Sequence, residues 1–204
     1  MEKLQQISEW LMRFASLNLL WIGYSLVGGL VVFGVVPATI ALFKVHFDRL
    51  SSDPDERSDF RIFHEGFVQN FLKGNVLMLI LLAAGIFLYA DLYIVLRMDH
   101  FLMSFIFGIL IALTIVYILF LLYAPAIFAY KSRTFWGLIK ASFTFAMLSP
   151  VYSGSLLLAF GIILYAGYQL PVIHLFFTAS IMSYLVTVVI LQNMEKLQRI
   201  SARG

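Results

Sequence analysis

Three residues near the start of the chain, Asn18, Trp21 and Tyr24, follow one another at intervals of three, which predicts one shared helix face. An amide, an indole N–H and a phenol on one face can hydrogen-bond a sugar-like or amphiphilic ligand. Side chains at the ends of two later apolar segments are candidates for the same ligand mouth: Tyr89, Asp91, Tyr165 and Tyr168. The alternative is structural, because Trp and Tyr mark membrane interfaces and a buried Asn often bridges helices. We favour the structural alternative.

The sequence offers little else for catalysis or metal binding. It has no HExxH, GxGxxG or Walker pattern, and its serines have no histidine base beside them in sequence. With no cysteine, the chain forms no disulfide and no thiolate metal site. His46 and His64 with nearby acids are a conceivable metal site, but a solvated loop is the expected explanation. We therefore expect no enzymatic activity, no cofactor and no metal.

The composition makes lipid the expected solvent for most of the fold. Hydrophobic residues make up 62% of the 204 residues, charged residues 12%, and the mean hydropathy is +0.94. A soluble domain of this size cannot bury so much apolar surface. We expect an all-α integral membrane bundle, with residues 1–204 as one membrane domain. The net charge of +3 comes from basic residues at the ends of apolar segments, so we expect no nucleic-acid partner.

Five apolar stretches are long enough, with flanking residues, to count as membrane spans. They are Leu17–Val36, Val76–Ala90, Phe101–Ala124, Val151–Ala166 and Val172–Leu191. Before them, residues 1–16 predict either an amphipathic helix at the interface or an outward extension of the first span. After them, residues 192–204 form the expected tail, and Gly167–Pro171 predicts a tight turn between the last two spans.

The distribution of basic residues predicts the orientation. With five spans, 11 of the 14 Lys and Arg fall on the side that holds the first linker (Lys44 to Lys73), the third linker (Lys131 to Lys140) and the C-terminal tail. The positive-inside rule then places that side in the cytoplasm. We expect Met1 outside and Gly204 in the cytoplasm.

An internal repeat is suggested by two segments. Leu81–Ala90 matches Leu157–Ala166 at eight of ten positions, and a Pro-Ala pair lies upstream of each. A duplication predicts two units, 17–90 and 101–166, inserted in parallel about an axis normal to the membrane. It also predicts that Ala90 ends its helix, which puts Asp91 at the outer boundary. The alternative is chance similarity within an apolar alphabet.

The two Pro-Ala pairs, Pro37-Ala38 and Pro125-Ala126, predict equivalent structural elements. Proline lacks the amide donor that a helix interior needs, so each is expected to end a span at the cytoplasmic boundary. The chain would then continue as interfacial helices over residues 38–49 and 126–131. Gly34 is expected to permit close helix packing.

The sequence resembles the YesL-like family of bacterial membrane proteins. The resemblance lies in Asn18-Leu19-Leu20-Trp21, the stretch Phe33–Phe43, the Phe71…Asn75 region and Pro125-Ala126. It covers essentially the whole chain. It implies a bacterial plasma membrane location and a link, by gene neighbourhood, to carbohydrate uptake and polysaccharide use. It implies no catalytic or binding residue.

These observations lead to three ranked hypotheses for function. The first is a non-enzymatic accessory protein of solute uptake, acting with a partner such as an ABC-type sugar importer. The resemblance implies that the solute is a carbohydrate. The second is a small transporter or channel acting as a homo-oligomer. The third is an intramembrane enzyme.

Overall fold

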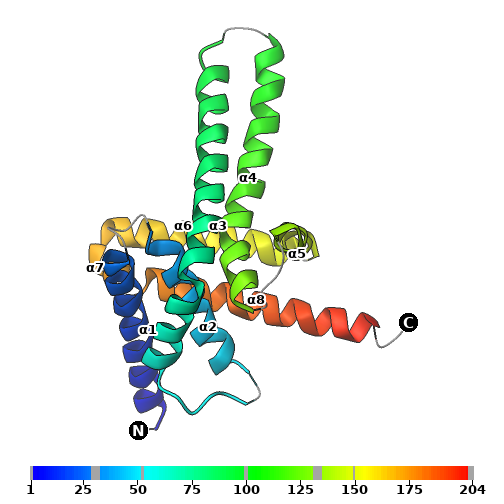
Figure 1. The fold of residues 1–204 in the computed structure, drawn as a ribbon. Helices are drawn as coiled ribbons and strands as arrows, with labels where there is room; N and C mark the ends of the chain where they lie inside the picture. The colour runs from blue at the N-terminus through cyan, green and yellow to red at the C-terminus, as the bar shows by residue number, and fades with distance from the viewer. Residues whose placement is uncertain are drawn as a thin grey trace.

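The computed structural model describes residues 2–28, 33–51, 53–98, 101–130, 135–148 and 150–201. All regular elements in these ranges are helices, which confirms the all-α prediction (Figure 1). They are α1 (Glu2–Val27), α2 (Val35–Arg49), α3 (Asp59–Val95), α4 (Phe101–Tyr130), α5 (Phe135–Leu148), α6 (Pro150–Gln169), α7 (Pro171–Phe176) and α8 (Thr178–Ser201).

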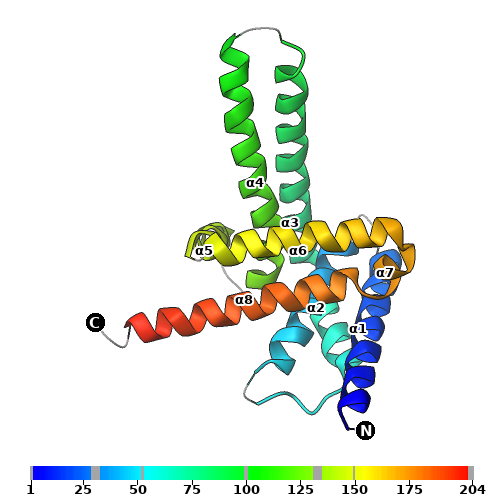
Figure 2. The same ribbon diagram turned by 180° about the vertical axis from the view of Figure 1, so that it is seen from behind.

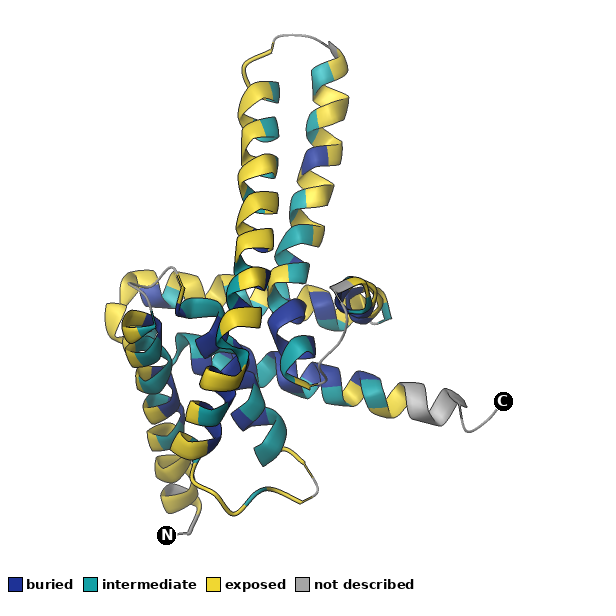
Figure 3. Cartoon of the chain, in the orientation of Figure 1, coloured by how far each residue is buried: buried dark blue, intermediate teal, exposed yellow. Residues whose placement is uncertain are grey.

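The dominant feature is a long antiparallel hairpin, in which α3 and α4 project together from a base formed by the other helices (Figures 1 and 2). The projecting helices are exposed on almost every side (Figure 3). Within their most apolar 18-residue windows, only 6% of α3 and 11% of α4 is buried. Water would oppose exposure of so much apolar surface, at about 25 cal/mol per Å². The hairpin therefore indicates a membrane protein.

The core of the base is built around α2. Its residues Ala38, Ile40, Ala41, Leu42 and Val45 are fully buried between the surrounding helices. One apolar cluster joins α2 to α1 and the first turns of α3, and a second joins it to α4, α5, α6 and α8. An apolar helix this short is stable because its neighbours cover it on nearly all sides.

The structure does not confirm a bundle of five spans. Three helices in the described residues, α3, α4 and α6, are long and apolar enough to cross a membrane. However, α6 and α8 lie crosswise to the α3–α4 hairpin (Figures 1 and 2). A flat bilayer that α3 and α4 cross would therefore run along α6 and α8. The predicted fifth span is also interrupted, because Phe177 separates α7 from α8.

Several predicted helix ends are wrong. The predicted first span is two helices, because α1 ends at Val27 and α2 begins at Val35. Since α1 runs unbroken from Glu2, residues 2–16 extend the same helix, which was the second of the two alternatives for this segment. Helix α3 passes through Ala90 and Asp91 to Val95, so Asp91 does not follow a helix end. The tight turn before Pro171 is present, although α6 ends at Gln169 and not at Gly167.

The predicted equivalence of the two prolines is also wrong. Pro37 lies in the first turn of α2, where a missing amide costs little because the first helical amides have no intrahelical partner. It does not end a span. Pro125 lies inside α4, which continues to Tyr130, so Pro125 and Ala126 do not redirect the chain. The matching segments of the proposed repeat lie on α3 and α6, which run crosswise, so the described structure does not confirm a parallel repeat.

Candidate functional site

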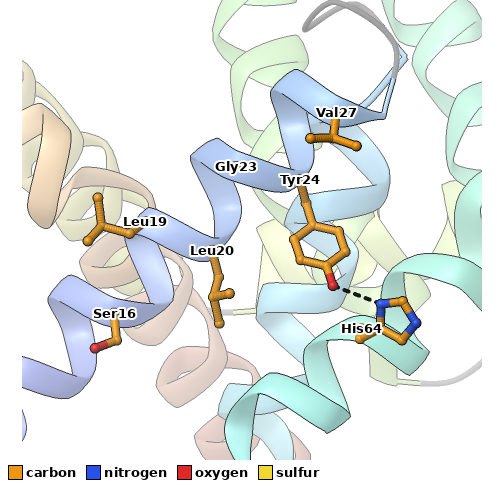
Figure 4. A pocket seen from close by; sticks show the side chains of 7 residues that line it. All are labelled: Ser16, Leu19, Leu20, Gly23, Tyr24, Val27 and His64. Atoms are coloured by element: carbon orange, nitrogen blue, oxygen red, sulfur yellow. Dashed lines mark hydrogen bonds between the residues drawn. The ribbon is translucent and has the colours of Figure 1, made fainter.

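An open groove of about 810 Å³ lies between α1 and the start of α3 (Figure 4). Its lining is apolar apart from three side chains, and the residues are Ser16, Leu19, Leu20, Gly23, Tyr24, Val27 and His64. Six of these come from α1, at successive intervals of three and one, which is the stripe that one face of an α-helix presents. Only His64 comes from α3.

Gly23 lies in the middle of the groove wall and leaves this part of α1 without a side chain. A Cβ built at Gly23 would meet no other atom within 4 Å, so the position opens onto free space. The volume falls within the range of ligand pockets, roughly 300–1,000 Å³. The sequence signals that could have identified this groove are the helical spacing of its lining residues on α1 and the glycine among them. Of the lining residues, only Tyr24 was named from the sequence as a candidate ligand contact.

Tyr24 and His64 form the polar end of the groove. Their side chains point toward one another, and the Tyr24 hydroxyl lies 2.7 Å from His64 Nδ1 (Figure 4). The Tyr24 ring packs edge-on against Phe63 and Phe67 at centroid distances of 5.2 and 5.0 Å, which fixes its direction. Because Nδ1 is engaged by Tyr24, Nε2 of the exposed His64 ring is the nitrogen available to a ligand.

Asn18 has a structural position. It is fully buried, and its amide nitrogen donates to the carbonyl oxygens of His174 (3.0 Å) and Leu175 (2.8 Å) at the end of α7. Its side-chain oxygen accepts from the backbone amides of Ala179 (2.9 Å) and Ser180 (3.1 Å) in the first turn of α8. Four bonds fill the capacity of this side chain. Asn18 therefore joins the two helices at their break and has nothing left for a ligand.

Trp21 also bonds within the fold. Its indole N–H donates to the Thr39 hydroxyl at 2.9 Å, and Thr39 donates to the Val35 carbonyl at 2.7 Å. Residues three apart in a helix are offset by about 60°, so Asn18 and Tyr24 differ by about 120° in direction. The three residues consequently face α7–α8, α2 and α3 in turn, and they do not share one ligand.

The remaining predicted contacts lie elsewhere in the described structure. Tyr89 is exposed on the projecting part of α3, where it stacks against Tyr93, and Asp91 lies two residues nearer the tip. Tyr165 and Tyr168 are exposed on α6, near its junction with α7. The C-terminal ends of α3 and α6 lie far apart (Figure 1), so these residues do not form a common mouth.

An ion-pair cluster at the base was not predicted. The carboxylate of Asp59 accepts two bonds from Arg13, at 2.8 and 3.0 Å, and one from Arg49, at 2.7 Å. Next to it, His46 is buried against Phe14 and Tyr184. Burial, followed by the charge of Arg13, lowers the pKa of His46 from 6.5 to about 4, so the ring is neutral at pH 7.

The cluster does not fit the predicted orientation. That orientation puts the start of the chain, which includes Arg13, outside and the linker next to Asp59 in the cytoplasm, yet the two side chains are in contact. Groups 2.8 Å apart cannot lie on opposite sides of a hydrocarbon core about 30 Å thick. The start of the chain and the α2–α3 linker therefore share one side. They also lie at the same end of the molecule, away from the α3–α4 tip (Figure 1).

No group of three or more His, Asp or Glu side chains in the described part of the chain is arranged to hold a metal ion. His46 and His64 belong to separate clusters, the first beside Asp59 and the second beside Tyr24. The pair of His64 and Tyr24 can donate or accept hydrogen bonds at the groove. The groove therefore combines an apolar wall with one polar end.

Comparison with known proteins gives the family. Residues 14–92 match a family described as a protein of unknown function, DUF624. YesL of Bacillus subtilis is 31% identical over 188 residues, which cover 90% of this chain and 86% of YesL. YteU of the same organism is also 31% identical over 188 residues, covering 89% of this chain and 81% of YteU. YesV is 27% identical over 163 residues, covering 80% and 77%. No solved structure matches the chain. The chain belongs to the DUF624 family, together with YesL of Bacillus subtilis.

Proposed function

We propose that this chain is a non-enzymatic protein of the bacterial plasma membrane that assists solute uptake through a partner transporter. The observation that carries the proposal is the α3–α4 hairpin, whose outward side chains are almost all exposed and apolar. Two antiparallel helices have no interior, so they cannot enclose a path for a solute. A protein whose membrane part is this hairpin needs other helices to move a solute.

The two helices of the hairpin are fixed to each other. The hydroxyl of Tyr117 donates to the carbonyl of Leu81 at 2.8 Å, across the hairpin. Gly85 makes room for this contact, because a Cβ there would lie 2.6 Å from the Tyr117 oxygen. The hairpin is thus a preformed unit that can pack against a partner without rearranging.

The outer face of α4 supports helix packing in the membrane. Ser104, Gly108 and Ala112 follow one another at intervals of four and are all exposed. A Cβ at Gly108 would meet nothing within 4 Å. Small residues at this spacing let two helix backbones approach closely in lipid. This face is where we place the contact with the partner.

The same hairpin suggests an orientation. The segment between α3 and α4 carries one basic residue, Arg97, whereas all other Lys and Arg of the chain precede residue 76 or follow residue 130. With the hairpin as the crossing unit, the positive-inside rule places the base in the cytoplasm and the tip outside. Both ends of the chain are then cytoplasmic, with α6 and α8 lying along the membrane.

The solute class rests on the family resemblance alone, which favours carbohydrate and an ABC-type importer as the partner. A second candidate function is a transporter formed by several copies of this chain. It is favoured by the same exposed face of α4, because one copy could supply the packing partner of the next.

Purification from the native membrane in mild detergent tests the proposal. We expect a transporter subunit to co-purify with the wild-type chain and to be lost from Gly108→Leu. The matched control is Gly154→Leu on α6, where a Cβ also meets nothing within 4 Å. Labelled sugar should not enter vesicles that contain this chain alone. Flux through the purified chain alone would overturn the proposal in favour of the homo-oligomeric transporter.

A further inference from the structure

We propose that the groove between α1 and α3 holds one acyl chain of a bilayer lipid, with the polar end of that lipid bound by Tyr24 and His64. This inference goes beyond the proposed function and does not depend on the identity of a partner transporter or solute. It does depend on the protein lying in a membrane, which the α3–α4 hairpin indicates.

The walls of the groove have the chemistry of a hydrocarbon site. Leu19, Leu20 and Val27 supply the apolar surface, and Gly23 leaves the space between them open. Leu19 is 45% exposed and Val27 is 88% exposed in the protein alone. An occupant with a flexible apolar chain would cover both side chains and gain the free energy of removing them from water.

The polar end of the groove selects the other half of the ligand. The Tyr24–His64 pair lies at one side of the apolar wall and retains the Nε2 position of His64 for a further hydrogen bond. When Tyr24 donates to Nδ1, Nε2 carries the proton and is a donor. Phosphate and ester oxygens of a lipid headgroup accept such a bond. Ser16 is less available, because its hydroxyl already donates to the Met12 carbonyl at 2.7 Å.

A bilayer lipid explains the groove better than a ligand from water. The groove is open along its length and almost entirely apolar, with its polar atoms gathered at Tyr24 and His64. A water-soluble ligand would need hydrogen-bond partners along most of its surface, and the α1 wall has none to offer. A lipid needs polar partners at one end only. The hairpin holds the base, and with it the groove, at the surface of a membrane, where lipids are the most abundant amphiphilic molecules.

Gly23→Leu gives a sharp test, because a Cβ at Gly23 meets nothing within 4 Å and the longer side chain extends from the middle of the groove wall. Gly161→Leu on α6 is the matched control, since a Cβ there also meets nothing within 4 Å. Each protein is placed in phosphatidylcholine vesicles that contain a phosphatidylcholine with a photoreactive acyl chain. After illumination, the labelled residues are mapped by mass spectrometry.

We expect strong labelling of residues 16–27 in the wild type and in Gly161→Leu. In Gly23→Leu, labelling of these residues should fall at least fivefold. Labelling of the α3–α4 hairpin should be equal in all three proteins. Tyr24→Phe should leave the apolar wall of the groove unchanged and remove only the hydroxyl at its polar end. The amount of phosphatidylcholine that stays bound through detergent exchange should then fall several-fold. Labelling of residues 16–27 that Gly23→Leu leaves unchanged would overturn the proposal, because the lipid would then contact α1 only as bulk solvent. Absence of labelling at residues 16–27 in the wild type, with a labelled hairpin, would also overturn it.

Discussion

Arg13 on α1 and Asp59 at the first position of α3 form an ion pair with two hydrogen bonds, although 46 residues separate them. Arg49, at the end of α2, donates to the same carboxylate at 2.7 Å. One side chain therefore holds the first three helices together at the base. The three side chains are between 21% and 38% exposed, so water screens their attraction only in part.

Asp59→Asn should destabilise the protein by about 1–2 kcal/mol, because it leaves two guanidinium groups with no carboxylate between them. For a chain of this size that is a fall of roughly 2–8 °C in the unfolding midpoint. Glu65→Gln is the matched control, since Glu65 pairs with Arg57 and Arg61 at the exposed surface. The midpoint in detergent should change by much less in the control, and equal losses in both would refute the central role of Asp59.

Asn18→Ala should be among the most destabilising single changes, at about 3 kcal/mol or more. It removes four hydrogen bonds and leaves buried donors and acceptors of α7 and α8 without partners. Asn70→Ala removes one bond, from its side chain to the Gly66 carbonyl at 2.7 Å, and should cost about 1 kcal/mol or less. Thermal unfolding of both variants in the same detergent gives the comparison. A smaller loss for Asn18→Ala than for Asn70→Ala would contradict this role.

Gly34→Ala should destabilise by about 1–3 kcal/mol. A Cβ at Gly34 would lie 2.2 Å from the backbone oxygen of Ser25, so the close approach of α1 and α2 would have to open. Gly23→Ala places the same methyl group in open space on α1 and should be neutral or slightly stabilising. Unfolding midpoints that rank the two variants the other way would show that α1 and α2 do not meet at this point.

Acidification should destabilise the protein through His46. Its pKa is about 4 in the folded chain and 6.5 when unfolded, so the unfolded state binds more protons between these values. The stability that His46 contributes is fully present above pH 6.5 and falls as the pH drops toward 4, by at most about 1.4 kcal/mol per pH unit. His46→Gln should flatten the dependence of the unfolding midpoint on pH between 6.5 and 4. The same slope in the wild type and in His46→Gln would exclude His46 as the source.

The helical class and the apolar hairpin could be predicted from the sequence, because long charge-free stretches have a direct physical meaning in lipid. The turn before Pro171 was also predictable, since proline fits the first position of a helix. Neither prediction requires knowledge of contacts between distant residues.

The arrangement of the helices could not be predicted in the same way. Hydropathy does not give the direction of a helix, so it could not show that α6 and α8, counted as spans, lie crosswise to the α3–α4 hairpin. Pro125 was expected to end a helix, but proline is tolerated inside α4, where it is buried among packed neighbours. The Arg13–Asp59 pair joins segments that hydropathy placed on opposite sides, and only the fold shows it.

The candidate site was predicted in part. Asn18, Trp21 and Tyr24 were all chosen for their spacing and polar groups. Tyr24 lines the groove, whereas Asn18 and Trp21 bond to other helices, in keeping with the structural alternative. His64 was missed because it lies 40 residues away in sequence, and the contact at 2.7 Å depends on how α3 packs on α1.

Labelling of single cysteines from one side of the membrane tests the central claim most directly. The chain contains no cysteine, so Lys3→Cys, Asp53→Cys and Met98→Cys each report one position, and all three residues are exposed. A maleimide that cannot cross the membrane is added to intact cells. The account predicts that Met98→Cys is labelled and that Lys3→Cys and Asp53→Cys are both protected until the cells are opened. Labelling of Lys3→Cys from outside while Asp53→Cys stays protected would contradict it, because the base would then be divided by the bilayer.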